Sequence, residues 1–319
     1  MKRIAALLFA LCSTVALAQS YPNKPVRIVI PFPPGGLTDV LGRGLGAELS
    51  RMWGQPVIID NRPGANTIIA AEYVAKQPAD GYTLFMATDA ALSSNQYLYN
   101  KLPYDPVKDF VPVVNMVTTT TILVAAPNLK ASNVRELVQL AKSKPGELTY
   151  GSFGPGSSTH MDTEAFSNLA GIKLTHVPYK GIADVVPAVM SSQIDLALSG
   201  VPPVLQHIRS GRLKAIAFAG ATRSPLLPDV PTFQEAGFRG FEAIAWFGLV
   251  APAGTPRAVL DKVAADVSEV LARPEFKEKF ITTVGLGPFT QNPDQFAEFL
   301  KQDRLKYQQR VKEVGVKLD

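Results

Sequence analysis

Cysteine is almost absent from this chain of 319 residues, which contains only Cys12. Because Cys12 lies in an N-terminal stretch that we expect to be removed, the rest of the chain offers no disulfide, thiol nucleophile or cysteine-based metal site. The three histidines, His160, His176 and His207, show no metal-ligand spacing, and no H-E-x-x-H motif occurs. The sequence therefore predicts neither a metal nor a cofactor.

Blocks of like charge are missing as well. The formal net charge of +5 at pH 7 falls by two when Lys2 and Arg3 are removed. Such a mild excess, spread along the chain, gives no support to nucleic-acid binding. Beyond the first residues no run approaches the ~20 apolar residues that a membrane span needs. We expect a soluble, monomeric protein.

The N-terminus has the pattern of a secretory signal. Lys2 and Arg3 precede an apolar run over residues 4–12, and the Ala-Leu-Ala of residues 16–18 supplies the small residues that signal peptidase requires. This predicts a signal peptide over 1–18, cleaved after Ala18, and export to the periplasm. The alternatives are a buried N-terminal helix and a lipoprotein, but Leu11 stands where a lipoprotein signal needs a small residue.

Apolar runs of strand length alternate with segments of helical period along the chain. The runs cover residues 26–32, 57–60, 82–88, 148–153, 174–179, 194–199, 213–219 and 247–251. Between them, Leu41, Leu45 and Leu49 recur every four residues, and 134, 137 and 141 share one helical face. This alternation predicts an α/β fold with mostly parallel sheets covered by helices on both faces. About 300 residues suit two domains better than one.

Helix ends are marked by capping residues. Thr255-Pro256 and Asn292-Pro293 each place a capping side chain before a proline at the first helical position. Gly54, Gly171 and Gly211 stand where helices should end. No low-complexity linker separates the two expected domains, which indicates a hinge of short strands between them.

A proline- and glycine-rich segment, residues 31–39, follows the first strand and opens a helix. Its prolines fix the loop, Gly35 and Gly36 permit close backbone approach, and Thr38 is placed to cap the helix. Free N–H groups at a helix start attract an anion. The alternative is a rigid turn without a ligand.

A second segment of this kind, residues 151–160, also stands between a strand and a helix. It combines glycines with the adjacent hydroxyls of residues 157–159, a composition that suits an oxygen-binding loop. It could equally be a helix cap with a flexible approach. A third segment, 87–91, ends the strand from Tyr82 and could complete the first wall. In open α/β sheets ligands bind beyond the carboxyl ends of the strands, which is where all three segments stand.

Eight blocks in order resemble a known family. The sequence resembles the substrate-binding proteins of tripartite tricarboxylate transporters, the Bug receptors. The blocks are YPNKP (21–25), PPGGLTD (33–39), NRPGA (61–65), DGYTL (80–84), YGS (150–152), HVPYKG (176–181), LPDVPT (227–232) and APAGTP (251–256).

The resemblance implies a two-lobed periplasmic binding protein of the Venus-flytrap, type II-like class with two crossovers between the lobes. We place the crossings near Thr121 and Ala245. Lobe 1 then comprises 19–121 with 246–319, which includes the C-terminal helix, and lobe 2 comprises 122–245. The implied function is a periplasmic receptor that captures a small organic carboxylate between the lobes and delivers it to a membrane transporter.

In this family backbone N–H groups, hydroxyls and ordered waters hold the ligand carboxylate. By the resemblance, one wall of the site consists of Phe32, Gly35, Gly36, Leu37, Thr38, Asp39, Thr88, Asp89 and Ala90. The facing wall consists of Phe153, Gly154, Gly156, Ser157 and His160, with Tyr179, Ser199 and Gly200 behind it.

Three of these side chains have more than one interpretation. Asp39 would repel an anion, so helix capping and loop bracing are favoured over contact with a ligand amine. His160 is favoured as a loop-packing residue, and Tyr179 could bind ligand or brace its turn. The sequence departs from the family after residue 65, where Asn66-Thr67-Ile68-Ile69 replaces the usual glycines. We expect this change to reshape a helix start near the cleft.

There are two alternatives to a transport receptor. Ser157 and His160 suggest a serine-type hydrolase, but no G-x-S-x-G motif occurs and their spacing does not itself create a nucleophile–base pair, so an enzyme is not expected. Alternatively, the protein binds the same class of ligand but acts on a sensor kinase instead of a transporter. Dicarboxylates, aromatic acids and amino acids all remain open as ligands.

Overall fold

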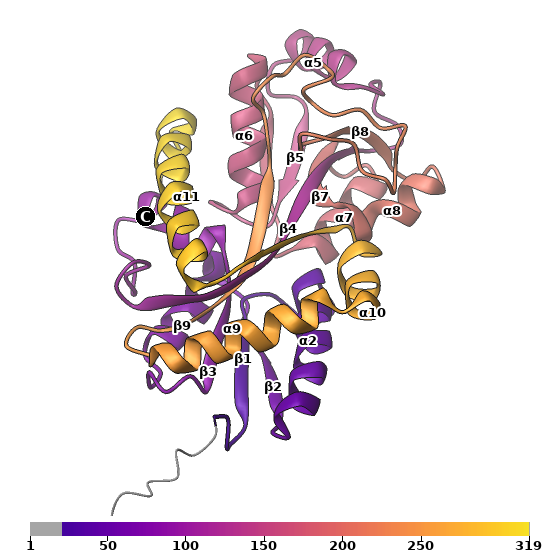
Figure 1. The fold of residues 1–319 in the computed structure, drawn as a ribbon. Helices are drawn as coiled ribbons and strands as arrows, with labels where there is room; N and C mark the ends of the chain where they lie inside the picture. The colour runs from indigo at the N-terminus through magenta and orange to yellow at the C-terminus, as the bar shows by residue number, and fades with distance from the viewer. Residues whose placement is uncertain (1–20, 319) are drawn as a thin grey trace, which may run out of the picture.

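The chain folds into two α/β lobes joined by strands that run through both (Figure 1). The computed structural model describes residues 21–318, so the predicted signal peptide (1–18) and its cleavage site lie outside it. None of the helices within 21–318 is both long enough and apolar enough to cross a membrane.

The first sheet carries the strands labelled in the lower half of Figure 1. Its members are β1 (Val26–Ile30), β2 (Val57–Asn61), β3 (Thr83–Thr88), β9 (Ile244–Pro252), β10 (Leu286–Gln291) and the first part of β4 (Phe110–Ala125). The helical segments around it are α2 (Leu37–Trp53), η2 (Ala65–Thr67), α3 (Ile68–Ala75), η3 (Ala90–Ser94), α4 (Asn95–Leu98), α9 (Arg257–Ala272), α10 (Pro274–Lys277), η4 (Glu278–Thr282) and α11 (Pro293–Val314).

The second sheet lies in the upper half of the same view. It contains the end of β4 with β5 (Thr149–Ser152), β6 (Thr175–Pro178), β7 (Leu196–Gly200) and β8 (Lys214–Phe218). Its helices are α5 (Val134–Ser143), α6 (Ser158–Ala170), α7 (Ile182–Met190) and α8 (Val201–Arg209). The strand order through both sheets is β2-β1-β3-β9-β4-β7-β5-β6, with β10 and β8 also paired to β4.

The prediction of mostly parallel sheets is wrong for the centre of the molecule. β1, β2 and β3 are parallel, as are β5, β6 and β7, but every pairing of β4 and β9 is antiparallel. The long strand β4 was not predicted at all. Its register with β9 continues to Thr120, and its register with β7 begins at Thr121. β9 runs opposite to β3, and β4 runs opposite to both β9 and β7, so βαβ alternation alone reveals neither of these strands.

Each sheet is covered on both faces, as predicted. Leu41, Leu45 and Leu49 of α2 are buried with α9 against one face of the first sheet. α3 and α11 pack on the opposite face around Phe85 and Phe296. In the second sheet α5 and α6 cover one face, and α7 and α8 cover the other. The predicted helix faces are therefore confirmed, because the spacing of apolar residues matches the burial.

The helix caps follow the sequence only in part. Asn292 caps α11 in a capping box with Gln295, as predicted, and Gly54 ends α2 in the left-handed conformation. The expected Thr255 cap is wrong: α9 starts after Pro256, and the Thr255 hydroxyl donates to the carbonyl of Pro252 (2.7 Å). A threonine hydroxyl can bond backward into a turn as readily as forward into a helix.

Candidate functional site

The carboxyl ends of the parallel strands of both sheets meet at the crossing segment of β4. Thr88 at the end of β3 pairs with Phe247, which pairs with Val117 of β4. Gly200 at the end of β7 pairs with Thr121. The two sets of strand ends therefore lie within a few residues of each other along one strand. In α/β proteins this is the edge where ligands bind, and each sheet contributes its loops to it.

The loop between β1 and α2 forms one side of this region and is held by Asp39. One carboxylate oxygen of Asp39 accepts hydrogen bonds from the backbone N–H of Gly35 and from Nε of Arg43, both at 2.9 Å. Burial raises the pKa of Asp39, but these two bonds, a hydrogen bond with Asn61 and the charge of Arg43 together leave the pKa below the usual value. Asp39 is therefore a charged loop brace, which is the role that the sequence favoured.

The start of α2 differs from the prediction at Thr38. The helix begins at Leu37, and Gly36 occupies the N-cap position at φ −77°. Thr38 is buried inside the first turn, so the expected Thr38 cap is wrong; among the described residues no side chain caps this helix. A side chain atom added to Gly36 would first meet the Pro33 carbonyl at 3.7 Å, an ordinary contact. Phe32, just before the loop, packs against the α2 side of the sheet.

The end of β3 contributes Thr88, which is followed by Asp89 and Ala90. The side chains of Thr88 and Asp89 have different environments. The Asp89 carboxylate is buried and accepts a hydrogen bond from the hydroxyl of Tyr307 on α11. Burial raises the pKa of Asp89 to about 7, against the lowering effect of the Tyr307 bond. Thr88 is 2% exposed, and within residues 21–318 its hydroxyl has no hydrogen-bond partner. The Thr88 hydroxyl therefore keeps unused hydrogen-bonding capacity in the described structure.

The loop between β5 and α6 forms the opposite side. Ser157 caps α6 by accepting from the backbone N–H of His160 (3.3 Å), and its hydroxyl donates to the carbonyl of Gly154 (2.7 Å). The backbone N–H of Gly156 donates to Nδ1 of His160 (3.0 Å). The backbone N–H of Phe153 donates to the Thr159 hydroxyl (3.1 Å). The loop is thus preorganised by its own hydrogen bonds.

His160 belongs to a stack of three rings beneath this loop. Its ring lies 4.0 Å from that of His176, which in turn lies 5.0 Å from Tyr150. Burial lowers the pKa of His160, and burial together with His160 lowers the pKa of His176 to about 4. Ser152, which is fully buried, bonds to Nε2 of His176 at 2.6 Å. Two neutral imidazoles therefore support the loop from below.

Tyr179, Ser199 and Gly200 lie behind the second loop. The backbone N–H of Tyr179 donates to the carbonyl of Ser152 (3.0 Å), and the Tyr179 ring packs in the apolar cluster of α7 and α8. The Ser199 hydroxyl is occupied by the carbonyl of Gly200 (2.8 Å). A side chain atom added to Gly200 would stand 3.6 Å from the hydroxyl of Thr119. Gly200 therefore lies beside the crossing strand.

Asn66 of η2, in the segment that departs from the family pattern, approaches the loop between β5 and α6. An atom added to Gly156 would stand 3.3 Å from Nδ2 of Asn66. Ala65, Asn66 and Thr67 all have positive φ (46°, 47° and 72°), although none is glycine. The segment forms a left-handed turn that leads into α3, and a reshaping relative to the family stays a prediction.

Thr119 is the residue near the strand ends that the sequence analysis missed. It is 6% exposed, and its hydroxyl has no hydrogen-bond partner in the part of the chain that the structure describes. The run of four threonines over 118–121 was the available signal. It could not be interpreted because β4 itself had not been recognised as a strand.

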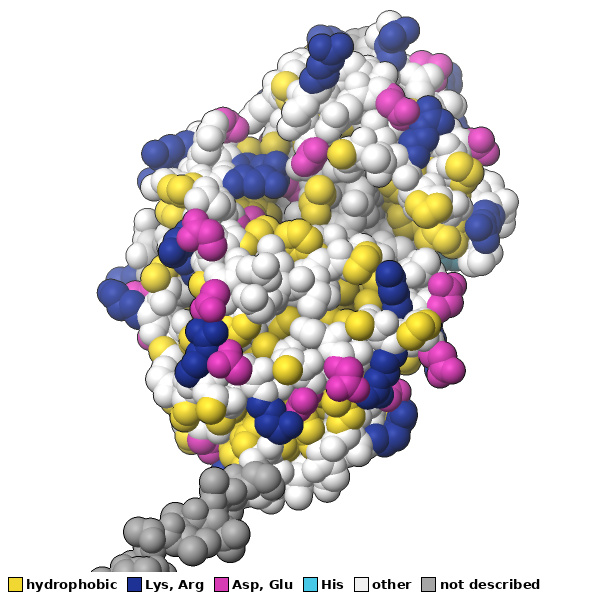
Figure 2. Space-filling model, in the orientation of Figure 1, with side chains coloured by type: hydrophobic (Ala, Val, Ile, Leu, Met, Phe, Trp, Pro, Cys, Tyr) yellow, Lys and Arg dark blue, Asp and Glu magenta, His cyan; other side chains and the backbone are white. Residues whose placement is uncertain are grey.

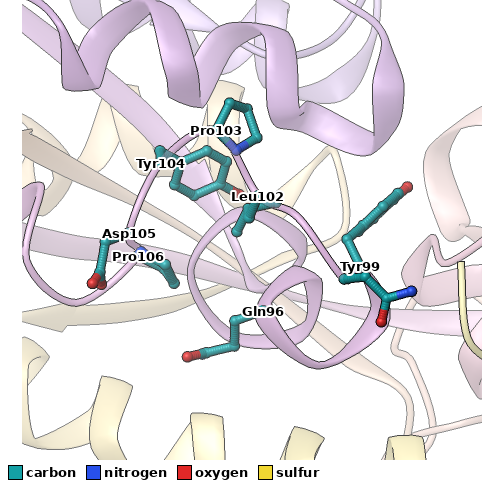
Figure 3. A pocket seen from close by; sticks show the side chains of 8 residues that line it. Gln96, Tyr99, Leu102, Pro103, Tyr104, Asp105 and Pro106 are labelled. Carbon is teal, nitrogen blue, oxygen red and sulfur yellow. The ribbon is translucent and has the colours of Figure 1, made fainter. Parts of the chain in front are cut away.

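The hollow drawn in Figure 3 is a separate feature. It has a volume of about 490 Å³ and lies on the connection between α4 and β4. Its lining residues are Gln96, Tyr99, Asn100, Leu102, Pro103, Tyr104, Asp105 and Pro106. The predicted ligand residues do not contribute to it.

Positively and negatively charged side chains are intermixed on the face of the molecule drawn in Figure 2.

Comparisons with known proteins find relatives in sequence and in fold. The model of the family described as "Tripartite tricarboxylate transporter family receptor" matches residues 41–316. Protein BugT of Bordetella pertussis is 35% identical over 302 residues, which cover 94% of this chain and 92% of BugT.

Two solved structures are similar over nearly the whole chain. R. palustris Rpa4515 with adipate has a TM-score of 0.88 at 33% identity, covering 93% of this chain and 99% of Rpa4515. MatC of Rhodopseudomonas palustris with bound malate has a TM-score of 0.84 at 30% identity, covering 91% and 100%.

Proposed function

Because this chain belongs to the tripartite tricarboxylate transporter receptor family, we propose that it captures a small organic carboxylate between its lobes in the periplasm and delivers it to a membrane transporter. One observation carries the proposal: the strand ends of both sheets converge on a single segment of β4, with a preorganised loop on each side. The adipate and malate bound to similar proteins support the ligand class.

The site we propose recognises its ligand with neutral donors. α2 and α6 both start in the facing loops, and a helix N-terminus favours a nearby carboxylate by ~0.3–1 kcal/mol, or up to ~2 when partly buried. Backbone N–H groups around Gly36 and in the first turn of α6 would contact the ligand, with Phe32, Leu37, Thr88, Ala90 and Phe153 around it. Preorganised dipoles can hold an anion without a buried, unpaired arginine.

Closure of the lobes is the proposed mechanism. Lobe 1 would comprise 19–121 with 246–319, and lobe 2 would comprise 122–245, so that β4 and the start of β9 form the hinge. A ligand that contacts both loops only in the closed form shifts the population toward that form. The approach of Asn66 in η2 to Gly156 supports such a closed arrangement, because it brings the first lobe close to the loop between β5 and α6.

The geometry argues against the hydrolase alternative. Nδ1 of His160 is occupied by the Gly156 N–H, so this nitrogen cannot act as base toward Ser157. The other serine–histidine pair, Ser152 with His176, has a serine that is 0% exposed and out of reach of a substrate. A receptor role is preferred because the site offers oriented donors without an activated nucleophile.

The proposal is tested by thermal shift on the mature protein, stripped of co-purified ligand, against carboxylates, amino acids and sugars. A ligand at ~100 times its Kd stabilises the fold by roughly 2.7 kcal/mol. We expect carboxylates alone to raise Tm, and small-angle scattering to show a more compact molecule with the best hit. A shift with sugars only, or unchanged dimensions on binding, would contradict the proposal.

The membrane partner needs a separate test. Deleting the gene should abolish uptake of the ligand if the partner is a transporter. Loss of a transcriptional response with uptake intact would favour the sensor-kinase alternative. A signal peptide is tested by the mass of the exported protein, which should begin at Gln19.

A further inference from the structure

We propose that Thr119, on the crossing strand, binds the far end of the ligand and makes the site selective for dicarboxylates over monocarboxylates. This inference rests on the proposed function. It assigns to Thr88 one end of the ligand and to Thr119 the other.

The sheet register places both hydroxyls on one face. Thr88 is directly opposite Phe247, and Thr119 is directly opposite Ala245, two residues along the same strand β9. Paired residues and residues two apart on a strand point to the same side of a sheet. Phe247 packs in the cluster of α2 and α9, so this is the face that continues into the loop before α2.

Both hydroxyls are buried and unused. Thr88 is 2% exposed and Thr119 is 6% exposed, and neither hydroxyl finds a hydrogen-bond partner among residues 21–318. By contrast, the Thr121 hydroxyl on the same strand donates to the carbonyl of Ala243 (3.2 Å). A buried hydroxyl without a hydrogen-bond partner destabilises the folded protein. A ligand oxygen at each position would remove that penalty.

The separation of the two threonines sets the ligand length. They lie two strands and two residues apart, which corresponds to about 12 Å between Cα atoms at ~4.8 Å per strand and ~3.4 Å per residue. With a hydrogen bond of about 2.8 Å at each end, two ligand oxygens roughly 6–8 Å apart would fit. Unbranched dicarboxylates of about four to six carbons have this spacing, whereas a monocarboxylate can engage only one of the two threonines.

Thr119 also meets the second lobe. Its hydroxyl stands 3.6 Å from an atom added to Gly200 at the end of β7. A ligand end held there would lie against the second sheet, while the Thr88 end would lie against the first. The pair of contacts would therefore couple ligand length to closure.

The test compares succinate, glutarate and adipate with butyrate, valerate and hexanoate by calorimetry on the stripped mature protein. The variants are T119V, T88V and, as a matched control on the same strand, T120V, whose side chain lies against Gly220. For T119V we expect a tenfold to hundredfold loss of affinity for the best dicarboxylate, since a hydrogen bond to a charged group is broken. The loss for the monocarboxylate of the same length should be threefold or less.

Two further results are expected. T88V should weaken both classes, and T120V should leave both unchanged. Without ligand, the Tm of T119V should equal or exceed that of wild type, because the lost hydroxyl has no partner to give up. A large drop in Tm would assign Thr119 a structural role and overturn the inference.

The outcomes separate this inference from the proposed function. Equal affinity of wild type and T119V for the dicarboxylates would overturn the role of Thr119 while the receptor function stands, as would a preference of wild type for monocarboxylates. Failure of wild type to bind any of the six acids would count against the proposed function itself.

Discussion

Arg310 of α11 and Asp162 of α6 form a buried ion pair that joins the two lobes, with side chains 13% and 4% exposed. Arg310 also donates to the carbonyl of Glu242 (3.0 Å). Burial lowers the pKa of Arg310, but Asp162, Tyr307, Asp89 and Asp303 together raise it above its usual value, while burial raises the pKa of Asp162 against the lowering effect of Arg310. In Figure 1, α11 rises beside α6, so a helix that starts on the first sheet ends against the second lobe.

Removing one member of this pair should be strongly destabilising. R310M leaves the buried Asp162 carboxyl without its cationic partner, and we expect a loss of about 3–5 kcal/mol in the free energy of unfolding. The double variant R310M/D162N should recover about half of that loss, because no charge is left unpaired. Urea unfolding measures both. An equal loss in the single and double variants would contradict the role of the pair.

Gly36 should matter for binding and little for folding. G36V adds a side chain where the backbone φ is ordinary and the nearest contact is 3.7 Å away. We therefore expect Tm of the free protein to change by only a few degrees, while carboxylate affinity falls more than tenfold because the ligand cannot approach the backbone. Calorimetry of G36V and the smaller G36A should show a graded loss. Unchanged affinity in both would remove this loop from the site.

The protein should be more stable with glycine in place of Thr67. A β-branched residue at φ 72° is strained, and glycine adopts this conformation without that penalty. We expect T67G to raise the free energy of unfolding by about 1 kcal/mol.

Gly171 provides a control in which the opposite substitution is made. It ends α6 at φ 62°, with open space around an added atom in the described structure. G171A should lower stability by about 1 kcal/mol for the reason that T67G raises it. If T67G instead destabilises the protein, the left-handed turn is not strained.

The protein should become less stable at acidic pH because His176 is protonated more readily in the unfolded chain. Its pKa in the folded protein is about 4, lowered by burial and by His160, while the unfolded value is about 6.5. The unfolded chain therefore binds the proton more readily between these values. The contribution of His176 is complete above pH ~6.5 and is lost as pH falls toward 4. Because the ring is only half buried, we expect on the order of 1 kcal/mol.

The variant H176Q isolates this effect. Denaturant unfolding at pH 7.5, 6, 5 and 4.5 should give a shallower decline in H176Q than in wild type. Other groups such as Asp89, whose raised pKa acts in the opposite direction, are present in both proteins and cancel in the difference. Parallel pH profiles for the two proteins would show that the stack does not hold His176 neutral.

The regular elements were predictable because their signals are local. Leu41, Leu45 and Leu49 mark a buried helix face wherever the helix packs, and the Asn292-Pro293 cap needs only its own first turn. The glycine-rich loops at 31–39 and 151–160 were found from composition alone. Asp39 could be assigned to bracing because its partners, Gly35 and Arg43, lie four residues away on either side.

The sequence by itself determined the α/β class, the two loops and the family, since each depends on short-range patterns or ordered blocks. Only the tertiary structure decided that β4 passes through both sheets, that Thr88 and Thr119 share a face, and that Arg310 reaches Asp162. These relationships join residues 31 to 148 positions apart. They depend on sheet register and helix packing, which residue spacing along the chain does not encode.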